Sequence, residues 1–182
     1  MKSVLISIRP EWCELIANGK KTIEVRKTKP NLKMPFKVYI YCTKGKFEPS
    51  ESLRNNLHYD DSTIKVCEGQ GKVIGEFVCD TIITDKTFGH DALFRAAACM
   101  SDAEAASYCV NNEMYGWHIT DLVIYSEPRE LSEFWSADKC PYVSKDGCTY
   151  KYHCFRAGQT KRCGSQITRP PQSWCYVEEV NP

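Results

Sequence analysis

The 182-residue sequence has no run close to the ~20 consecutive apolar residues that a membrane-spanning helix requires, which argues against a helical membrane protein. It also has no recognisable secretory signal, because Arg9, Pro10 and Glu11 interrupt the N-terminal apolar run before any small-residue cleavage site. Its formal net charge is only +1, which excludes the non-specific coating of nucleic acid by a strongly basic protein. We therefore expect a cytoplasmic protein in which a local basic patch makes any contact with nucleic acid.

The spacing of apolar residues predicts short strands and helices along the first part of the chain. Residues 11–18 place apolar side chains at helical spacing, and Gly19 stands where a helix often ends. Residues 22–26 alternate apolar and polar side chains, as a half-buried strand does. The other predicted elements are strands over 4–8, 36–42, 71–84 and 115–125, and two helices within 91–113, the second opened by a capping box of Ser101 and Glu104. This succession predicts an α+β domain.

Two segments carry a resemblance to a known family. The run ISIRPEWCELIANGKKTIEVRK, residues 6–27, resembles the opening of ASCH domains of the PUA-like superfamily, and YGWHITDLVIY, residues 115–125, resembles a late strand of that fold. The similarity extends over about residues 3–134, and it implies that residues 1–134 form a small twisted PUA-like β-barrel with flanking helices and a cleft beside the first helix and second strand. It also implies RNA binding or RNA-modification chemistry.

The cleft implied by the resemblance contains residues that suit a nucleic-acid ligand. Lys20, Lys21 and Arg26 are cations near one predicted strand, suited to phosphate contacts. Glu24 lies between them and needs a partner if buried, either Arg26 or a ligand. Flat surfaces for an unstacked base are available at Trp12, Tyr41 and Trp117, the last next to His118. The alternative is that both tryptophans are core residues and His118 is a hydrogen-bonded structural residue.

A catalytic role for the same cleft is a second hypothesis. Some bacterial ASCH proteins resemble this chain and remove the acetyl group of N4-acetylcytidine with a lysine, a threonine three residues later and a glutamate. Lys21 matches the lysine, but Glu24 occupies the position of the threonine, and Thr22 is the nearest hydroxyl. Glu76 or Glu104 would be the third group. Alternatively, Glu24 acts as general base on a water and Lys21 stabilises the oxyanion.

Residues 135–182 are predicted to form an irregular Cys-rich extension packed on the same domain. The sequence has eleven cysteines, and Cys140, Cys148, Cys154 and Cys163 are candidate ligands of a structural Zn²⁺. No C-x2-C pair is present, so reduced, unligated thiols are the alternative. Similar ASCH proteins from prophage-like regions have such a tail, which ends in a segment like residues 167–179 here. That segment is expected to add a strand or to cover the barrel.

Three functions therefore remain open. The first is a module that binds RNA or a modified nucleoside in the cleft around Lys21, Glu24 and Arg26. The second is a hydrolase acting on a modified base or on RNA. The third is a protein-interaction module with a vestigial cleft. The sequence leaves the oligomeric state open.

Overall fold

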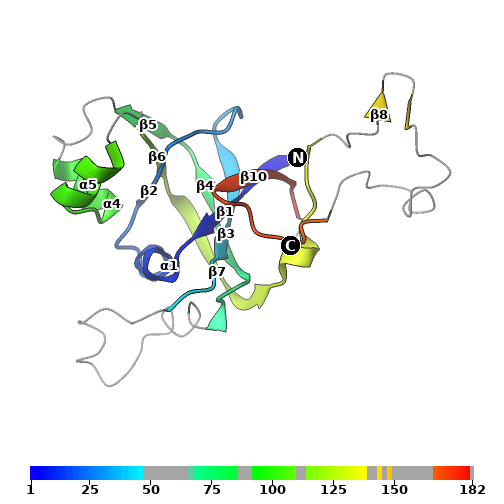
Figure 1. Ribbon diagram of the computed structural model, residues 1–182, viewed down its shortest axis with the longest axis horizontal. Helices are drawn as coiled ribbons and strands as arrows, with labels where there is room; N and C mark the ends of the chain where they lie inside the picture. Colours follow the sequence, from blue (N-terminus) through cyan, green and yellow to red (C-terminus); the bar gives the residue numbers. More distant parts are fainter. Residues whose placement is uncertain are drawn as a thin grey trace.

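The computed structural model describes residues 1–46, 66, 68–85, 92–109, 114–138, 143–144, 147–148 and 166–180. In chain order the elements are β1 (Lys2–Ile8), α1 (Pro10–Ala17), β2 (Ile23–Arg26), β3 (Phe36–Cys42), β4 (Val73–Cys79), β5 (Ile82–Asp85), α4 (Ala92–Ala98), α5 (Asp102–Cys109), β6 (Met114–His118), β7 (Thr120–Arg129), the 3₁₀ helix η1 (Leu131–Glu133), β8 (Val143–Ser144), β9 (Gly147–Cys148) and β10 (Trp174–Glu178). The predicted mixture of helices and strands is confirmed (Figure 1).

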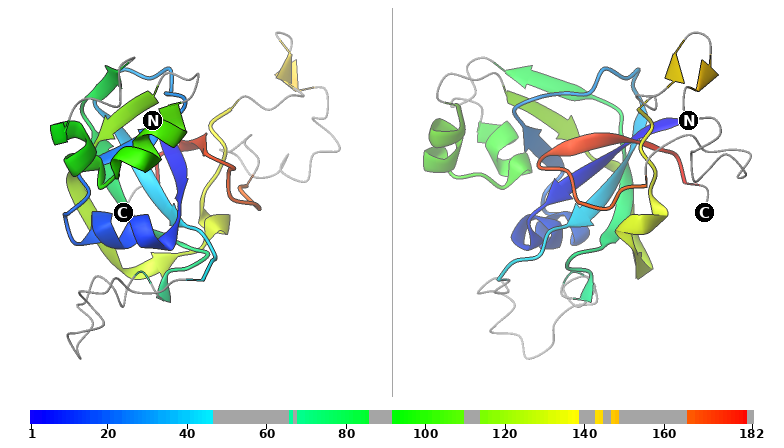
Figure 2. Two further views of the ribbon diagram at one scale, coloured as in Figure 1. Left: turned by 60° about the vertical axis from the view of Figure 1, so that its left-hand side comes forward. Right: turned by 45° about the vertical axis from the view of Figure 1, so that its right-hand side comes forward.

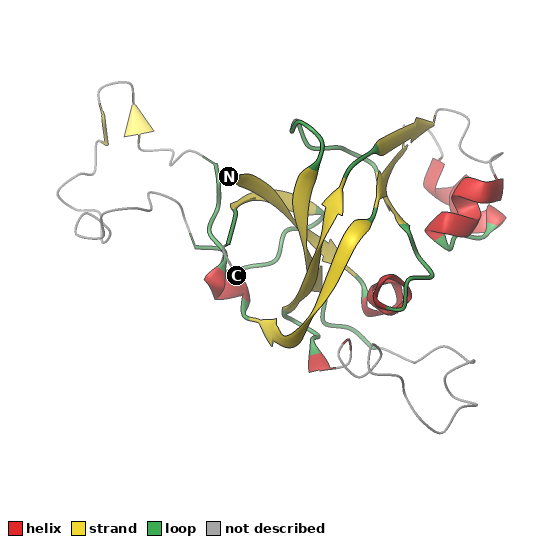
Figure 3. Cartoon of the chain, turned by 180° about the vertical axis from the view of Figure 1, so that it is seen from behind, coloured by secondary structure: helices red, strands yellow, loops and turns green. Residues whose placement is uncertain are grey.

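Most of the strands form two sheets. The larger has the order β10-β1-β3-β4-β7, and the smaller has the order β2-β6-β5. Within the larger sheet β1 is buried along nearly its whole length, because its apolar residues are covered on both faces. Figure 3 shows α1, α4 and α5 together at one end of the molecule, beside the smaller sheet.

Two bends carry the chain between the sheets. β4 pairs with β7 in the larger sheet, and their neighbours β5 and β6 pair in the smaller one. The predicted strand over residues 71–84 is therefore divided at Asp80 and Thr81, where Thr81 O accepts a hydrogen bond from the backbone N–H of His118 at 3.0 Å. The two sheets thus share a continuous ribbon of chain that turns from one to the other (Figure 2).

The predicted small twisted β-barrel does not close in the part of the chain that the structure describes. β1 has β3 on one edge and β10 on the other, so neither edge is left to pair with β2. Within the described ranges, β2 pairs only with β6. The arrangement is consequently an open pair of sheets.

The C-terminal segment adds a strand to the larger sheet. β10 runs antiparallel to β1, with Ser3 opposite Val177 and Ile6 opposite Trp174, and the strand predicted within 167–179 is confirmed. The zinc prediction falls on residues outside the described ranges, namely Cys140, Cys154 and Cys163, and of Cys148 only its place in β9 is described. No group of three or more possible metal ligands occurs among the residues that the structure describes. No helix in the described ranges is both long and apolar enough to cross a bilayer.

The helices end and begin as their terminal residues favour. α1 has Asn18 at its C-cap, and Gly19 follows with a φ of +74°, a conformation that costs glycine little. The predicted capping box of α5 is confirmed, because Ser101 Oγ accepts from the N–H of Glu104 at 3.3 Å and Glu104 Oε2 accepts from the N–H of Ser101 at 2.8 Å. α4 packs on the smaller sheet through Phe94, which contacts Ile23 and Met114 in one apolar cluster.

Gly116 tests how closely α4 packs on β6. A Cβ added at Gly116 would collide with the Phe94 ring, so we expect Gly116→Ala to lower the free energy of unfolding by about 1–3 kcal/mol. Gly45→Ala is the control, because its Cβ would meet only Pro10 Cδ, at 3.9 Å. Urea unfolding followed by circular dichroism measures both, and equal changes in the two variants would contradict this packing.

Candidate functional site

A cavity of about 360 Å³ lies between α1, β2 and α5. The connection from α1 to β2 forms its floor, and α5 with the residues before it forms the opposite wall. Its lining residues are Arg9, Trp12, Lys21, Glu24, Val25, Lys27, Met100, Glu104, Ser107 and Tyr108. We call it the cleft.

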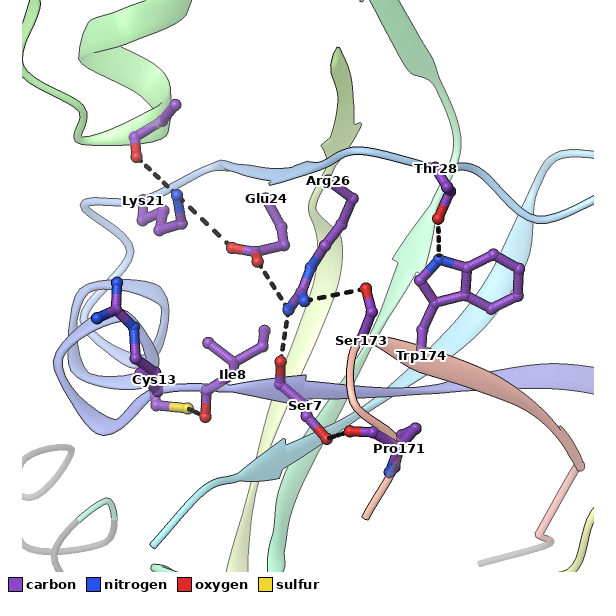
Figure 4. Close-up of polar contacts among 12 residues, drawn as sticks. Ser7, Ile8, Cys13, Lys21, Glu24, Arg26, Thr28, Pro171, Ser173 and Trp174 are labelled. Carbon is purple, nitrogen blue, oxygen red and sulfur yellow. Dashed lines mark hydrogen bonds and ion pairs between the residues drawn. The ribbon is translucent and has the colours of Figure 1, made fainter. Parts of the chain in front are cut away.

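Three charged side chains meet at the floor of the cleft. Glu24 Oε2 lies 3.6 Å from Lys21 Nζ, and Glu24 Oε1 lies 3.0 Å from Arg26 Nη2. Lys21 and Glu24 are only 4% and 5% exposed, so water screens these ion pairs weakly. Figure 4 shows the carboxylate between the two cations. We call these three residues the charged triad.

The position of Lys21 follows from the end of α1. After Gly19 turns the chain, the N–H of Lys21 donates to Leu15 O at 2.9 Å, which directs the residue back under the helix. Its Nζ donates to the carbonyl oxygen of Ala98, at the end of α4, at 2.6 Å, and lies 5.0 Å from the centre of the Trp12 ring. Burial lowers the pKa of Lys21, and the negative charge of Glu24 opposes this effect in part.

Arg26 is held by three separate parts of the chain. Its Nη2 donates to the carbonyl oxygen of Ser7 in β1 at 2.6 Å and contacts Glu24, while its Nη1 donates to Ser173 Oγ at 3.4 Å. Ser173 immediately precedes β10 and is itself fixed, because its carbonyl oxygen accepts from the N–H of Ser7 at 2.9 Å. Ser7 Oγ also donates to Pro171 O at 2.7 Å. The C-terminal segment therefore helps to position the charged triad.

The walls of the cleft combine aromatic and charged side chains. Trp12 and Tyr108 are half-buried and lie on α1 and α5. Lys27 Nζ lies 5.0 Å from the centre of the Tyr108 ring. Hydrogen bonds from the backbone and hydroxyl of Ser101 lower the pKa of Glu104, which keeps this carboxylate ionised at neutral pH.

The structure brings together only part of the set predicted from the sequence. Trp12, Lys21 and Glu24 line the cleft, and Arg26 supports Glu24 from behind. Lys20 and Thr22 are exposed and do not line it.

The other predicted residues lie elsewhere. Trp117 is fully buried and packs against Phe36 and Trp174 at ring-centre distances of 5.9 and 6.0 Å, so it is a core residue without a free face for a base. Tyr41 lines a different hollow, near Leu131. His118 Nδ1 lies 2.8 Å from Asp80 Oδ1 at the bend between the sheets, and His118 does not line the cleft.

Several residues of the site had no signal in the sequence that placed them there. Ser107 and Tyr108 belong to a helix that the sequence predicts, but its docking opposite α1 is a tertiary contact. Ser173 lies 147 residues after Arg26 in the chain. A polar residue in an otherwise apolar strand, as Ser7 is in β1, was the available clue, since buried hydroxyl groups need partners.

Comparison with known proteins gives a family and a fold. The model of the ASCH domain matches residues 6–119. The crystal structure of ASCH from Zymomonas mobilis is similar with a TM-score of 0.56 and 16% sequence identity, over 97% of this chain and 88% of that chain. Crystal structures of two variants of that protein, one Tyr-to-Phe and one Ser-to-Ala, give TM-scores of 0.55 and 0.54 at 16% identity, over 98% and 97% of this chain and 92% and 89% of theirs. At this identity the likeness concerns the fold. No curated protein matches the sequence.

The burial of the charged triad makes Glu24 important for stability. Glu24→Gln leaves Lys21 and Arg26 without their shared anion, and we expect a loss of about 3 kcal/mol in the free energy of unfolding. Glu11→Gln is the control, because Glu11 pairs with Arg9 at 3.2 Å on the surface and an exposed pair contributes little. Denaturant titration of both variants measures the difference, and similar losses would contradict the role given to burial.

Proposed function

The chain belongs to the ASCH domain family, and we propose that its cleft binds a nucleoside, either a free modified nucleoside or one within RNA. The observation that carries this proposal is that Lys21 and Glu24, with Arg26 behind them, line a cavity that Trp12 and Tyr108 also line. Preorganised charge beside aromatic surface is the combination that holds an unstacked base.

The hydrogen-bonding capacity of the floor supports this proposal. An ammonium group has three donors, and Lys21 directs two of them at Ala98 O and Glu24, so one remains for a ligand acceptor. A carboxylate has about four acceptor sites, and only two of those of Glu24 face the cations. The floor thus offers a donor next to acceptors, which complements the alternating groups on the edge of a nucleobase.

The size and walls of the cleft fit the same ligand. About 360 Å³ is within the range of roughly 300–1,000 Å³ typical of small-molecule sites. Trp12 and Tyr108 come from two different helices, so a planar ligand can contact an aromatic surface from either wall. Arg9 and Lys27 add positive charge among the lining residues, where a phosphate or ribose would lie.

Binding can be followed through tryptophan fluorescence with a panel of nucleosides that includes cytidine and N4-acetylcytidine. We expect a saturable signal for at least one nucleoside. Lys21→Ala and Tyr108→Ala should each weaken that affinity 10- to 100-fold, since a hydrogen bond to a charged group contributes about 1.5–3 kcal/mol and base stacking on an aromatic ring about 1–3 kcal/mol.

His118→Ala is the control variant, because His118 lies outside the cleft on an exposed pair with Asp80. Its affinity should equal that of the unmodified protein. If no nucleoside binds, or if His118→Ala weakens binding as much as Lys21→Ala does, the cleft is not the nucleoside site.

Hydrolysis of a modified base is the second candidate, and the buried ion pair of Lys21 and Glu24 in the lining of the cleft is the observation that favours it. A buried lysine whose pKa is lowered is suited to proton transfer or to stabilising a developing oxyanion. Since Thr22 is exposed and does not line the cleft, a mechanism through its hydroxyl has no geometric support. Glu24, with free acceptor sites beside Lys21, is the better candidate for activating a water.

Deacetylation of N4-acetylcytidine, measured by product formation, tests this second candidate. If Lys21 stabilises the oxyanion as the ammonium form, kcat should fall as the pH rises through the pKa of Lys21, which burial lowers below the usual value of a lysine. Lys21→Ala and Glu24→Gln should abolish turnover, whereas Thr22→Ala should retain it. Loss of turnover in Thr22→Ala would instead support the threonine as nucleophile, and no turnover by the unmodified protein would leave binding alone.

A further inference from the structure

The loop between β2 and β3 has an unusual charge distribution. Between Glu24 and Glu48 the sequence contains seven cations and no carboxylate, namely Arg26, Lys27, Lys29, Lys33, Lys37, Lys44 and Lys46. This run contrasts with the whole chain, whose 24 basic and 23 acidic residues nearly balance. The local excess of positive charge therefore extends from β2 through the loop and β3 to the residues that follow, and Lys27 brings part of it to the cleft.

Five of these cations are exposed and have no anionic partner within the described part of the chain, and three of the five lie in the loop between β2 and β3. Lys27, Lys29 and Lys33 are exposed, and none forms an ion pair with a described carboxylate. Lys37 differs, since it lies 2.9 Å from Glu76 and 3.7 Å from Glu179. We call Lys27, Lys29 and Lys33 the lysine track.

Aromatic rings lie beneath the first two lysines of the track. Lys27 Nζ is 5.0 Å from the centre of the Tyr108 ring, and Lys29 Nζ is 5.2 Å from the centre of the Tyr115 ring. Both rings are half-buried, so these contacts keep the ammonium groups on the surface near the cleft.

The lysine track connects two hollows. Lys27 lines the cleft, and Lys33 lines a second hollow of about 490 Å³ at the other end of the same loop. The loop crosses from β2 to β3 along one side of the molecule (Figure 1). All three charged residues in the stretch from Lys27 to Lys33 are thus exposed cations that lie between or beside the two hollows.

The second hollow has an apolar surface with cations around it. Leu32, Met34 and Pro35 supply apolar atoms, and the Met34 side chain is 49% exposed although it is large and hydrophobic. Lys2, Lys33 and Lys37 also line it, together with Glu179, whose carboxylate is paired with Lys37 at 3.7 Å. Apolar surface bordered by ammonium groups suits the base and ribose of an unstacked nucleotide whose phosphate stays at the rim.

We propose that the cleft takes its nucleoside from within a single-stranded RNA chain, whose flanking phosphates lie along the lysine track and whose neighbouring nucleotide occupies the second hollow. This inference rests on the function proposed above and specifies its ligand as a polyanionic strand. Complementary charge is the reason, because exposed cations attract phosphates, and Lys29 and Lys33 lie outside the lining of the cleft that would hold a free nucleoside.

The test compares a labelled single-stranded oligoribonucleotide of mixed sequence with the free nucleosides cytidine and N4-acetylcytidine. The variant Lys29→Ala/Lys33→Ala leaves the cleft lining intact. Each phosphate contact on a single strand contributes about −0.7 to the slope of log K against log salt concentration, so losing two should make the slope shallower by about 1.4. We expect the oligoribonucleotide affinity to fall on the order of tenfold at low salt, and the nucleoside affinity to stay unchanged.

Lys44→Ala/Lys72→Ala is the matched control, because it removes the same charge elsewhere. Lys44 lines a hollow beside Tyr41, and Lys72 is paired with Glu130 at 2.8 Å. This variant should keep the salt slope and affinity of the unmodified protein. An equal loss of oligoribonucleotide affinity in both double variants would mean that the affinity depends on net charge alone. That result would overturn the proposed role of the lysine track.

The outcomes separate this inference from the function on which it rests. If a nucleoside binds in the cleft, but the oligoribonucleotide binds no more tightly than the nucleoside and without salt dependence, the proposed role of the lysine track is overturned. The proposed function of the cleft is then retained. If the oligoribonucleotide binds through Lys29 and Lys33 but Lys21→Ala has no effect on either ligand, the cleft is not the nucleoside site. The proposal that one RNA strand occupies both the cleft and the lysine track is then overturned too.

Discussion

The burial of Glu24 between Lys21 and Arg26 is the constraint on which the rest of the structure depends. A carboxylate and two cations removed from water destabilise a protein unless each is paired and hydrogen-bonded. Here Ala98 O accepts from Lys21, and Ser7 O accepts from Arg26, so every charge has a second partner. These contacts require β1, β2, the end of α1 and the end of α4 to converge. The interaction that defines the candidate site is thus also one that fixes the fold around it.

This constraint extends to the far end of the chain. Ser173 contacts Arg26, and the strand that follows holds the β2–β3 loop: Trp174 Nε1 donates to Thr28 Oγ1 at 3.0 Å, and the N–H of Asn31 donates to Tyr176 Oη at 2.8 Å. The family match ends at residue 119, so each of these contacts joins a residue of the matched region to one that lies after it. They place the C-terminal strand beside both the charged triad and the loop that bears the lysine track. The loop is therefore held by hydrogen bonds to this segment although its lysines are exposed. Figure 4 shows the contact between Thr28 and Trp174.

The charge of the molecule is organised locally. A net charge of +1 creates little long-range attraction for nucleic acid, but the β2–β3 loop concentrates cations where acidic residues are missing. The cleft floor has the opposite design, with charges that are buried and already paired. Exposed cations suit the capture of a polyanion, and buried paired charges suit the recognition of hydrogen-bonding groups. The exposed cations and the buried ion pairs lie next to each other, because Lys27 belongs to both the cleft lining and the loop.

Local pattern was enough to predict the α+β composition, the helix that ends just before Gly19, and the capping box of Ser101 and Glu104. It also singled out Lys21 and Glu24 as candidates, and it offered a C-terminal strand as one of two possibilities for residues 167–179. These depend on periodicity, on residues with a strong local preference and on a short motif. Tertiary structure alone decided that β1 pairs with β3 and β10, which leaves the two sheets open, and that Trp117 lies in the core while Tyr108 lines the cleft. Strand partners and the docking of helices are contacts between residues far apart in the chain. A strand's alternation shows that one face is buried, but not which residues bury it.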